Sequence, residues 1–299
     1  MKKLLALALL AASSLSAQAA LKVATLHPLI ADVVRTVGGD KVEVVEVLKA
    51  GADVHHFEPG ARDIAAMRGA GIIFASGKNL ESYLGKLRDS VGPSVKVVEV
   101  GRPIPSLKME PGQDVFVCCP HHAHSAIDPH WWHSAENMRR AARVIADELA
   151  EADPANEKAY EAGAKAAGNR FMELKKWAQQ QIATIPRGDR KLVTAHAAFG
   201  YFCKEFGFKS IPVLGIGRSD DVSSQYIAQA IQLIRDNKIR AVFPEDQANP
   251  KVLAEIVRST GAKTGKPLVA DGTATYAHTF ETMLAHNVRA IVEALGVKK

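Results

Sequence analysis

The stretch that decides the fold lies in the middle of the chain, at residues 153–182, and reads DPANEKAYEAGAKAAGNRFMELKKWAQQQI. It opens with Asp153, a capping residue, followed by Pro154, which suits the first position of a helix. The rest is rich in Ala, Glu and Lys, and only Gly163 and Gly168 interrupt it. A helix of this length measures about 40 Å at 1.5 Å per residue, which is long for a globular protein. The stretch therefore predicts one stiff connector between two parts of the chain.

Both flanks of this connector alternate short β-branched runs with amphipathic stretches. Strands are expected at Leu21–Thr25, Val42–Leu48, Gly71–Ser76, Val95–Val100, Lys191–Ala195, Ser210–Leu214, Arg240–Phe243 and Pro267–Ala270. Helices are expected near Ala31–Val37, Arg62–Arg68, Leu80–Ser90, Ala197–Phe206, Ser223–Asn237, Pro250–Thr260 and Thr279–Leu295. Such alternation is typical of parallel sheets with right-handed crossovers.

The predicted fold class is α/β, with two lobes that each hold a parallel β-sheet flanked by helices, joined by one long rigid helix. The first lobe is expected at 21–152, the linking helix at 153–184 and the second lobe at 185–299.

Residues 1–20 have the three parts of a cleavable signal peptide. Lys2 and Lys3 give a positive start, residues 4–12 are apolar, and Ala17-Gln18-Ala19 is a small-residue cleavage site. The apolar run is too short to span a bilayer, and no Cys follows it to carry a lipid anchor. We therefore expect a periplasmic protein that contacts the membrane only through a partner.

The composition excludes nucleic-acid binding as the main activity. The chain is 47% hydrophobic and 23% charged, and its net charge of +6 includes two lysines of the signal peptide. Because the basic residues are scattered among acidic ones, no basic footprint for a nucleic acid emerges.

The three cysteines do not form the paired knuckles of a zinc ribbon. Cys203, in an apolar run, is expected to be a small buried residue. Cys118 and Cys119 precede a His cluster, where they could form a vicinal disulfide or touch metal. An odd number leaves at least one thiol unpaired within a monomer.

The placement of the histidines is the most informative functional feature. Five of the 11 lie within residues 121–133, as His121, His122, His124, His130 and His133. His196 follows one predicted strand and Asp271 follows another, and ligands of open α/β sheets bind beyond the carboxyl ends of strands. Two His-bearing loops of the first half, one with the pair His55-His56 and one with the His cluster, could join them in a cleft between the lobes. Three imidazoles and a carboxylate suit tetrahedral zinc.

With these residues in place, the chain resembles the metal-binding receptors of zinc and manganese ABC importers, the cluster A-I solute-binding proteins. The resemblance covers essentially the whole mature chain. It runs through Ala24-Thr25, Leu29-Ile30-Ala31-Asp32-Val33, Gly51 to Asp63, Gly77-Lys78-Asn79-Leu80-Glu81, Asp128-Pro129-His130-Trp131-Trp132, His196 to Phe202, Phe243-Pro244-Glu245 and His286-Asn287-Val288. Each piece is a weak signal alone, but the order of the pieces is specific.

The resemblance implies four metal ligands: His55, His130, His196 and Asp271. It favours His55 over His56, because the ligand of the family stands three residues before the position of Glu58. The zinc members have His at the position of His196, where manganese members usually carry Glu, and imidazole suits borderline metals better than manganese.

Glu245 is similar to an acidic residue near the site of the family, where it would fix the tautomer of an imidazole. The resemblance further implies a monomeric receptor without enzymatic activity. It would bind Zn(II) with high affinity as its transported ligand and deliver it to an ABC permease that works with a cytoplasmic ATPase.

The chain departs from the pattern of the family in two places. Ala197 stands where zinc members commonly have Asp, and their long His-rich loop is reduced to His121-His122-Ala123-His124. This short loop could recruit zinc weakly or be a plain solvated loop.

Three alternatives stay open at this point. The first is a manganese or iron(II) receptor of the same class. The second is a periplasmic zinc hydrolase, which needs an open coordination position and a general base. The third is a zinc chaperone or adhesin with the same fold.

Overall fold

The first lobe is built on a four-stranded parallel sheet. The computed structural model describes residues 19–108, 127–212, 224–245 and 250–297. Within them, strands β1 (Leu21–Thr25), β2 (Val42–Glu46), β3 (Ile72–Ala75) and β4 (Lys96–Glu99) lie in the order β2-β1-β3-β4. Val23 and Phe74 belong to one buried cluster and Ala24 and Ile73 to another, as expected when successive side chains point to opposite faces.

Helices cover both faces of this sheet. On one face α1 (Pro28–Gly38) and α5 (Ala135–Ala152) join the cluster of Val23, and on the other α2 (Ala61–Arg68) and α3 (Leu84–Val91) join the cluster of Ala24. The sheet is therefore the middle of three layers.

The second lobe repeats the strand order of the first. Strands β5 (Lys191–Thr194) and β6 (Lys209–Pro212) pair in parallel, as do β7 (Ala241–Val242) and β8 (Lys263–Thr264). The two pairs are joined by a hydrogen bond from the backbone N–H of Phe243 to the carbonyl of Val193 at 2.9 Å. The resulting order, β6-β5-β7-β8, matches β2-β1-β3-β4. The helices of this lobe are α7 (Gly200–Phe206), α8 (Ser224–Asp236), α9 (Pro250–Thr260) and α10 (Phe280–Leu295).

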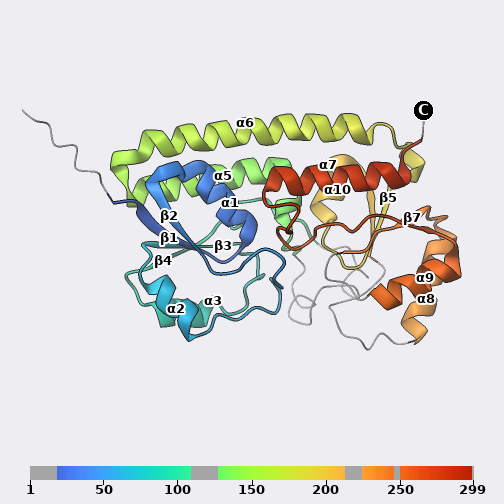
Figure 1. The fold of residues 1–299 in the computed structure, drawn as a ribbon, viewed down its shortest axis with the longest axis horizontal. Helices are drawn as coiled ribbons and strands as arrows, with labels where there is room; N and C mark the ends of the chain where they lie inside the picture. The colour runs from blue at the N-terminus through green and yellow to red at the C-terminus, as the bar shows by residue number, and fades with distance from the viewer. Residues whose placement is uncertain (1–18, 109–126, 213–223, 246–249, 298–299) are drawn as a thin grey trace, which may run out of the picture.

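The connector is α6 (Glu157–Ile182), which runs along both lobes (Figure 1). Its 26 residues span about 39 Å at 1.5 Å each. It packs against α1 and α5 of the first lobe and against α10 of the second. Gly163 lets α6 approach α1 closely, since a Cβ there would lie 2.3 Å from the carbonyl oxygen of Val37. One buried hydrophobic cluster extends from the first lobe through α6 into the second, so the lobes share a core.

The predicted fold class is confirmed, while some elements differ from expectation. Asp153 and Pro154 open a 3₁₀ turn, η4 (Pro154–Asn156), and the α-helix begins only at Glu157. Helix α5 is absent from the expected elements. The expected strand Pro267–Ala270 is wrong: only Leu268 forms a bridge, with Glu245, and the regular pairing of β8 lies earlier.

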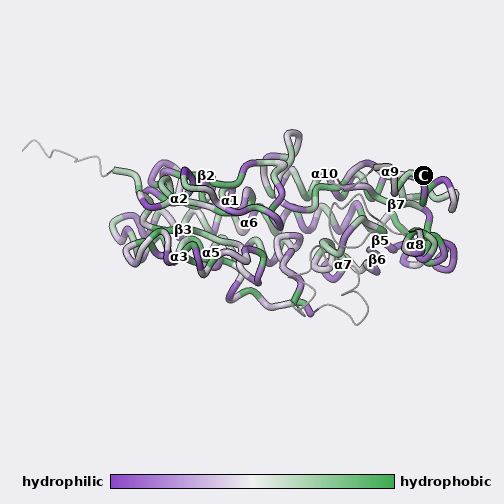
Figure 2. The backbone as a smooth tube through the Cα atoms, turned by 90° about the horizontal axis from the view of Figure 1, so that it is seen from below, coloured by the Kyte–Doolittle hydropathy of each residue, from purple (hydrophilic) through white to green (hydrophobic). Residues whose placement is uncertain are grey.

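No helix among the described residues is both long and apolar enough to cross a membrane. Figure 2 shows why, because hydrophilic and hydrophobic residues are interspersed along the helices. The expected signal peptide falls almost entirely on residues 1–18, which lie outside the described residues.

Candidate metal centre

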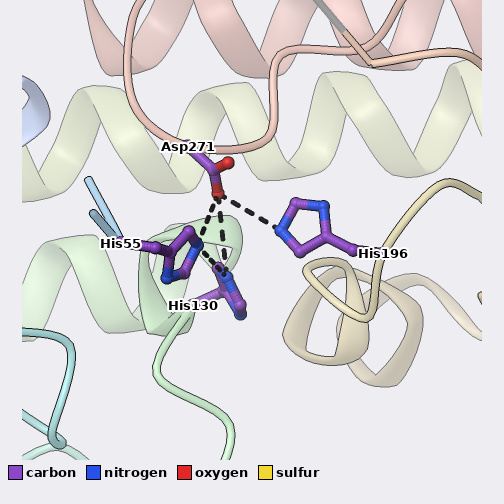
Figure 3. Close-up of side chains that lie close together, drawn as sticks. All are labelled: His55, His130, His196 and Asp271. Atoms are coloured by element: carbon purple, nitrogen blue, oxygen red, sulfur yellow. Dashed lines mark hydrogen bonds and ion pairs between the residues drawn. The ribbon is translucent and has the colours of Figure 1, made fainter. Parts of the chain in front are cut away.

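Four segments from both lobes bring His55, His130, His196 and Asp271 together (Figure 3). His55 lies in the loop between β2 and α2, and His130 directly precedes the 3₁₀ turn η3 (Trp131–His133). His196 lies two residues after β5, and Asp271 follows the segment that bridges to Glu245. These are the four residues that the family resemblance predicts as ligands, and their side chains point toward one common centre.

The distances between their polar atoms define a small cage. The Oδ1 atom of Asp271 lies 3.3 Å from Nε2 of His55, 3.4 Å from Nε2 of His196 and 3.7 Å from Nε2 of His130. The Nε2 atoms of His55 and His130 are 3.3 Å apart. One atom from each of the four residues lies within 4.8 Å of all the others. At zinc–nitrogen distances of about 2.0–2.1 Å, the ligand atoms of a tetrahedral site lie roughly 3.3–3.4 Å apart.

Carboxylates fix two of the imidazoles from behind. Asp128 Oδ1 accepts from Nδ1 of His130 at 2.8 Å and from its backbone N–H at 2.9 Å. Glu245 accepts from Nδ1 of His196 through one oxygen and from its backbone N–H through the other, at 3.0 Å. Since Nδ1 of each ring is engaged by a carboxylate, Nε2 is the nitrogen of each ring that faces the centre.

Burial and neighbouring charges shift the pKa of the site residues in different directions. Burial, reinforced by the imidazoles of His55 and His196, holds the pKa of His130 well below its usual range. Burial also opposes the charged form of His196, but the carboxylates of Glu245 and Asp271 outweigh it and hold that pKa well above its usual range. Burial alone would raise the pKa of the Asp271 carboxyl, yet the imidazoles of His196 and His55 outweigh burial and hold this pKa well below its usual range. The two shifts have the same origin, because the charged forms of His196 and Asp271 stabilise each other.

Sequence reasoning missed the role of Asp128, and it placed Trp132 and His133 near the site without predicting their contacts. Asp128 was quoted only as part of a motif, although Asp53-Val54-His55 and Asp128-Pro129-His130 share one Asp-x-His pattern in which Asp Oδ1 accepts the N–H of the His. That repeat is a readable signal. The bonds that Trp132 and His133 make to Ala270 have no such signal, because they join residues more than a hundred positions apart.

Other sequence candidates do not lie at this centre or are outside the described residues. His121, His122 and His124 fall within 109–126, as do Cys118 and Cys119, so their expected roles stay predictions. Cys203 lies buried in α7, and burial raises the pKa of its thiol.

The chain thus has two α/β lobes joined by one helix, with a His- and Asp-lined centre between them. Solved structures share this fold. The periplasmic zinc-binding protein TroA of Treponema pallidum matches with a TM-score of 0.81 at 24% identity, over 93% of this chain and all of that one. The Mn-bound periplasmic metal-binding protein of Candidatus Liberibacter asiaticus matches with a TM-score of 0.80 at 23% identity, over 92% of this chain and 99% of the other.

Residues 23–294 match the model of the family described as ZnuA, zinc-uptake complex component A, periplasmic, and the chain belongs to this family. It is thus an extracytoplasmic metal-binding receptor of an ABC importer. Among its relatives, the manganese-binding lipoprotein MntA of Bacillus subtilis is 29% identical over 290 residues, covering 94% of this chain and 91% of that protein. The iron-binding protein YfeA of Yersinia pestis is 30% identical over 252 residues, covering 84% and 77%.

Proposed function

We propose that this protein is the high-affinity Zn(II) receptor of its importer and that His55, His130, His196 and Asp271 are the four metal ligands. The observation that carries the proposal is the donor set, since three imidazole nitrogens and one carboxylate oxygen lie within 4.8 Å of one another. Their separations are close to those of a tetrahedral zinc site.

The donor set favours zinc over the metals named in the relatives. Manganese prefers oxygen ligands in octahedral geometry, whereas imidazole suits zinc. Glu245 contacts the ring Nδ1 and the backbone N–H of His196 and is not among the four residues whose ligand atoms converge. The names of MntA and YfeA nevertheless make manganese and iron(II) the competing cargoes that an experiment must include.

The same contacts argue against a zinc hydrolase. Such an enzyme keeps one coordination position for water and a general base beside it. In the proposed site Asp271 would take the fourth position, and its Oδ1 lies 3.3 Å from Nε2 of His55 and 3.7 Å from Nε2 of His130. Glu245, the nearest candidate base, holds His196. We therefore assign capture and transport of the metal, without catalysis.

Delivery completes the proposed function. Residues 1–20 would direct export to the periplasm and be removed, and the mature protein would work as a monomer. It would hand its metal to an ABC permease whose transport is driven by a separate cytoplasmic ATPase.

A competitive titration tests this proposal. The mature protein is titrated with Zn(II) against Mn(II) and Fe(II) in the presence of a chromophoric chelator, beside His196→Ala and the control His278→Ala, whose side chain is exposed. We expect one tightly bound Zn(II) in the wild type and in the control, and a large loss of affinity in His196→Ala. Preference for Mn(II) or Fe(II) would refute the assigned cargo, and an unaffected His196→Ala variant would refute the ligand set.

A further inference from the structure

The segment before Asp271 is held by side chains rather than by a regular strand. Within this segment, both backbone groups of Val269 are hydrogen-bonded to the side-chain amide of buried Asn287. The amide oxygen accepts from the N–H of Val269, and the amide nitrogen donates to the carbonyl of Val269, each at 2.9 Å. The next carbonyl, that of Ala270, accepts from Nε1 of Trp132 at 2.9 Å and from Nε2 of His133 at 2.7 Å. The last peptide before Asp271 therefore depends on two donors from distant parts of the chain.

Both donors come from the turn that carries another residue of the site. Trp132 and His133 belong to η3, which begins directly after His130. Their bonds to Ala270 thus connect the turn behind His130 with the peptide before Asp271, across the boundary of the lobes. We call this pair of hydrogen bonds the Ala270 clamp.

The clamp is buried and tightly packed. Trp132, His133 and Ala270 are 1%, 0% and 5% exposed. The Trp132 ring lies 4.4 Å from the ring of His27, and the His133 ring lies 4.4 Å from that of Phe199. Buried hydrogen bonds are electrostatically stronger than exposed ones, and a buried carbonyl that loses its hydrogen bonds costs free energy. Packing also fixes both rings, so the Ala270 carbonyl cannot shift without leaving its donors.

His133 is not among the residues whose ligand atoms converge at the centre, and its contacts suit it to this task. Because its Nε2 faces a carbonyl, that nitrogen carries the proton. Its Nδ1 atom has no hydrogen-bond partner among the described residues, and its ring packs against that of Phe199.

We propose that Trp132 and His133 are positioning residues that hold the Asp271 carboxylate at its distance from His130 and thereby set how long the metal is retained. The proposal rests on the ligand set proposed above. Without the clamp, the backbone before Asp271 moves relative to His130, and the Asp271 carboxylate becomes the first ligand to dissociate from the metal.

The experiment compares four variants of this region with the wild type and with the ligand variant Asp271→Ala. Trp132→Phe and His133→Phe keep an aromatic ring but each removes one donor, and His133→Gln restores an N–H donor. The control is Trp131→Phe, because Trp131 is equally buried and also donates to a backbone carbonyl, that of Ser76 at 3.2 Å, but within the first lobe. Each protein is loaded with Zn(II), and release to excess chelator is followed by stopped flow. The absorption spectrum of the Co(II) form and the Tm of the metal-free protein are measured in parallel.

Partners of metal ligands typically contribute 10–100-fold to metal affinity, so we expect Trp132→Phe and His133→Phe to release Zn(II) about 10–100 times faster. Their Co(II) spectra should change, since the carboxylate is displaced. His133→Gln should recover slow release, and Trp131→Phe should release at the wild-type rate even where its Tm falls.

Two outcomes overturn the clamp while leaving the proposed function intact. One is wild-type release and an unchanged Co(II) spectrum in both Trp132→Phe and His133→Phe, while Asp271→Ala loses Zn(II). The other is equal acceleration in Trp131→Phe and Trp132→Phe, which reports general loosening. An Asp271→Ala variant that still binds Zn(II) tightly would instead refute the ligand set itself.

Discussion

Replacing Glu245 by Gln tests how much of the metal affinity depends on the group behind His196. Glu245 is buried and uses its two oxygens for two N–H donors of His196, one on the backbone and one on the ring. An amide has only one oxygen, so in Glu245→Gln an NH₂ group must face one of these donors. A hydrogen bond to a charged group contributes about 1.5–3 kcal/mol. At 1.4 kcal/mol for each factor of ten, its loss corresponds to about 10–100-fold weaker Zn(II) binding.

The assay is competition with a chromophoric chelator at fixed neutral pH. Glu81→Gln is a matched control, because Glu81 is also buried and also accepts two N–H donors, from Ser76 at 2.6 Å and Gly77 at 2.9 Å, in the first lobe. Glu81→Gln should lower the Tm and leave Zn(II) affinity unchanged. Equal affinity of Glu245→Gln and the wild type would refute the reasoning, since the orientation of His196 would then need no carboxylate.

Two further predictions concern pH and packing. First, Zn(II) affinity should fall with falling pH, and the fall should begin above the ordinary pH range of His, because the raised pKa of His196 means that the metal displaces a proton there. In Glu245→Gln the fall should move to lower pH, and Kd values measured across pH can check both expectations. Second, Gly163→Ala should destabilise the protein by about 1–3 kcal/mol, because the new Cβ would overlap the carbonyl of Val37. Gly85→Ala, at an open position of α3, should stabilise the protein by about 0.5–1 kcal/mol. Thermal or urea unfolding measures both variants, and equal Tm values would contradict the close approach of α6 and α1.

The sequence predicts most of the fold because its signals are local. The strand Leu21–Thr25 and the helix Pro250–Thr260 have the expected limits, since short β-branched runs and 3.6-residue periodicity need no tertiary information. Helix α5, which was not among the expected helices, also has a local signal, because Ser134 caps it by accepting the N–H of Asn137. Segment 267–270 is different. Its apolar run suggests a strand, but Asn287, Trp132 and His133 take the places of strand neighbours, and such long-range contacts leave no local pattern.

The four residues of the centre could be selected from the sequence, but their arrangement could not. Residues His55 and His130 stand in loops whose path depends on Asp53 and Asp128, each of which accepts the N–H two residues later. That local turn is short enough to read. The distance between Asp271 and the imidazoles depends on the packing of both lobes on α6, which no spacing in the sequence encodes.

The repeated strand order explains why a histidine after a strand is not enough to make a metal site. Thr25 pairs with Phe74 in the first lobe as Thr194 pairs with Phe243 in the second. His27 follows Thr25 by two residues, as His196 follows Thr194, so the two histidines occupy equivalent positions in the two lobes.

Their chemistry differs because of the residue two positions after the paired phenylalanine. In the second lobe it is Glu245, whose carboxylate holds the ring of His196 and raises its pKa. In the first lobe it is Ser76, which cannot supply a charge. Burial therefore dominates at His27 and lowers its pKa to about 3, and its Nδ1 accepts the N–H of Leu29 at the start of α1. One fold position thus serves as a helix cap in one lobe and faces the candidate metal centre in the other, and the two lobes differ there in the carboxylate of Glu245, just beyond β7.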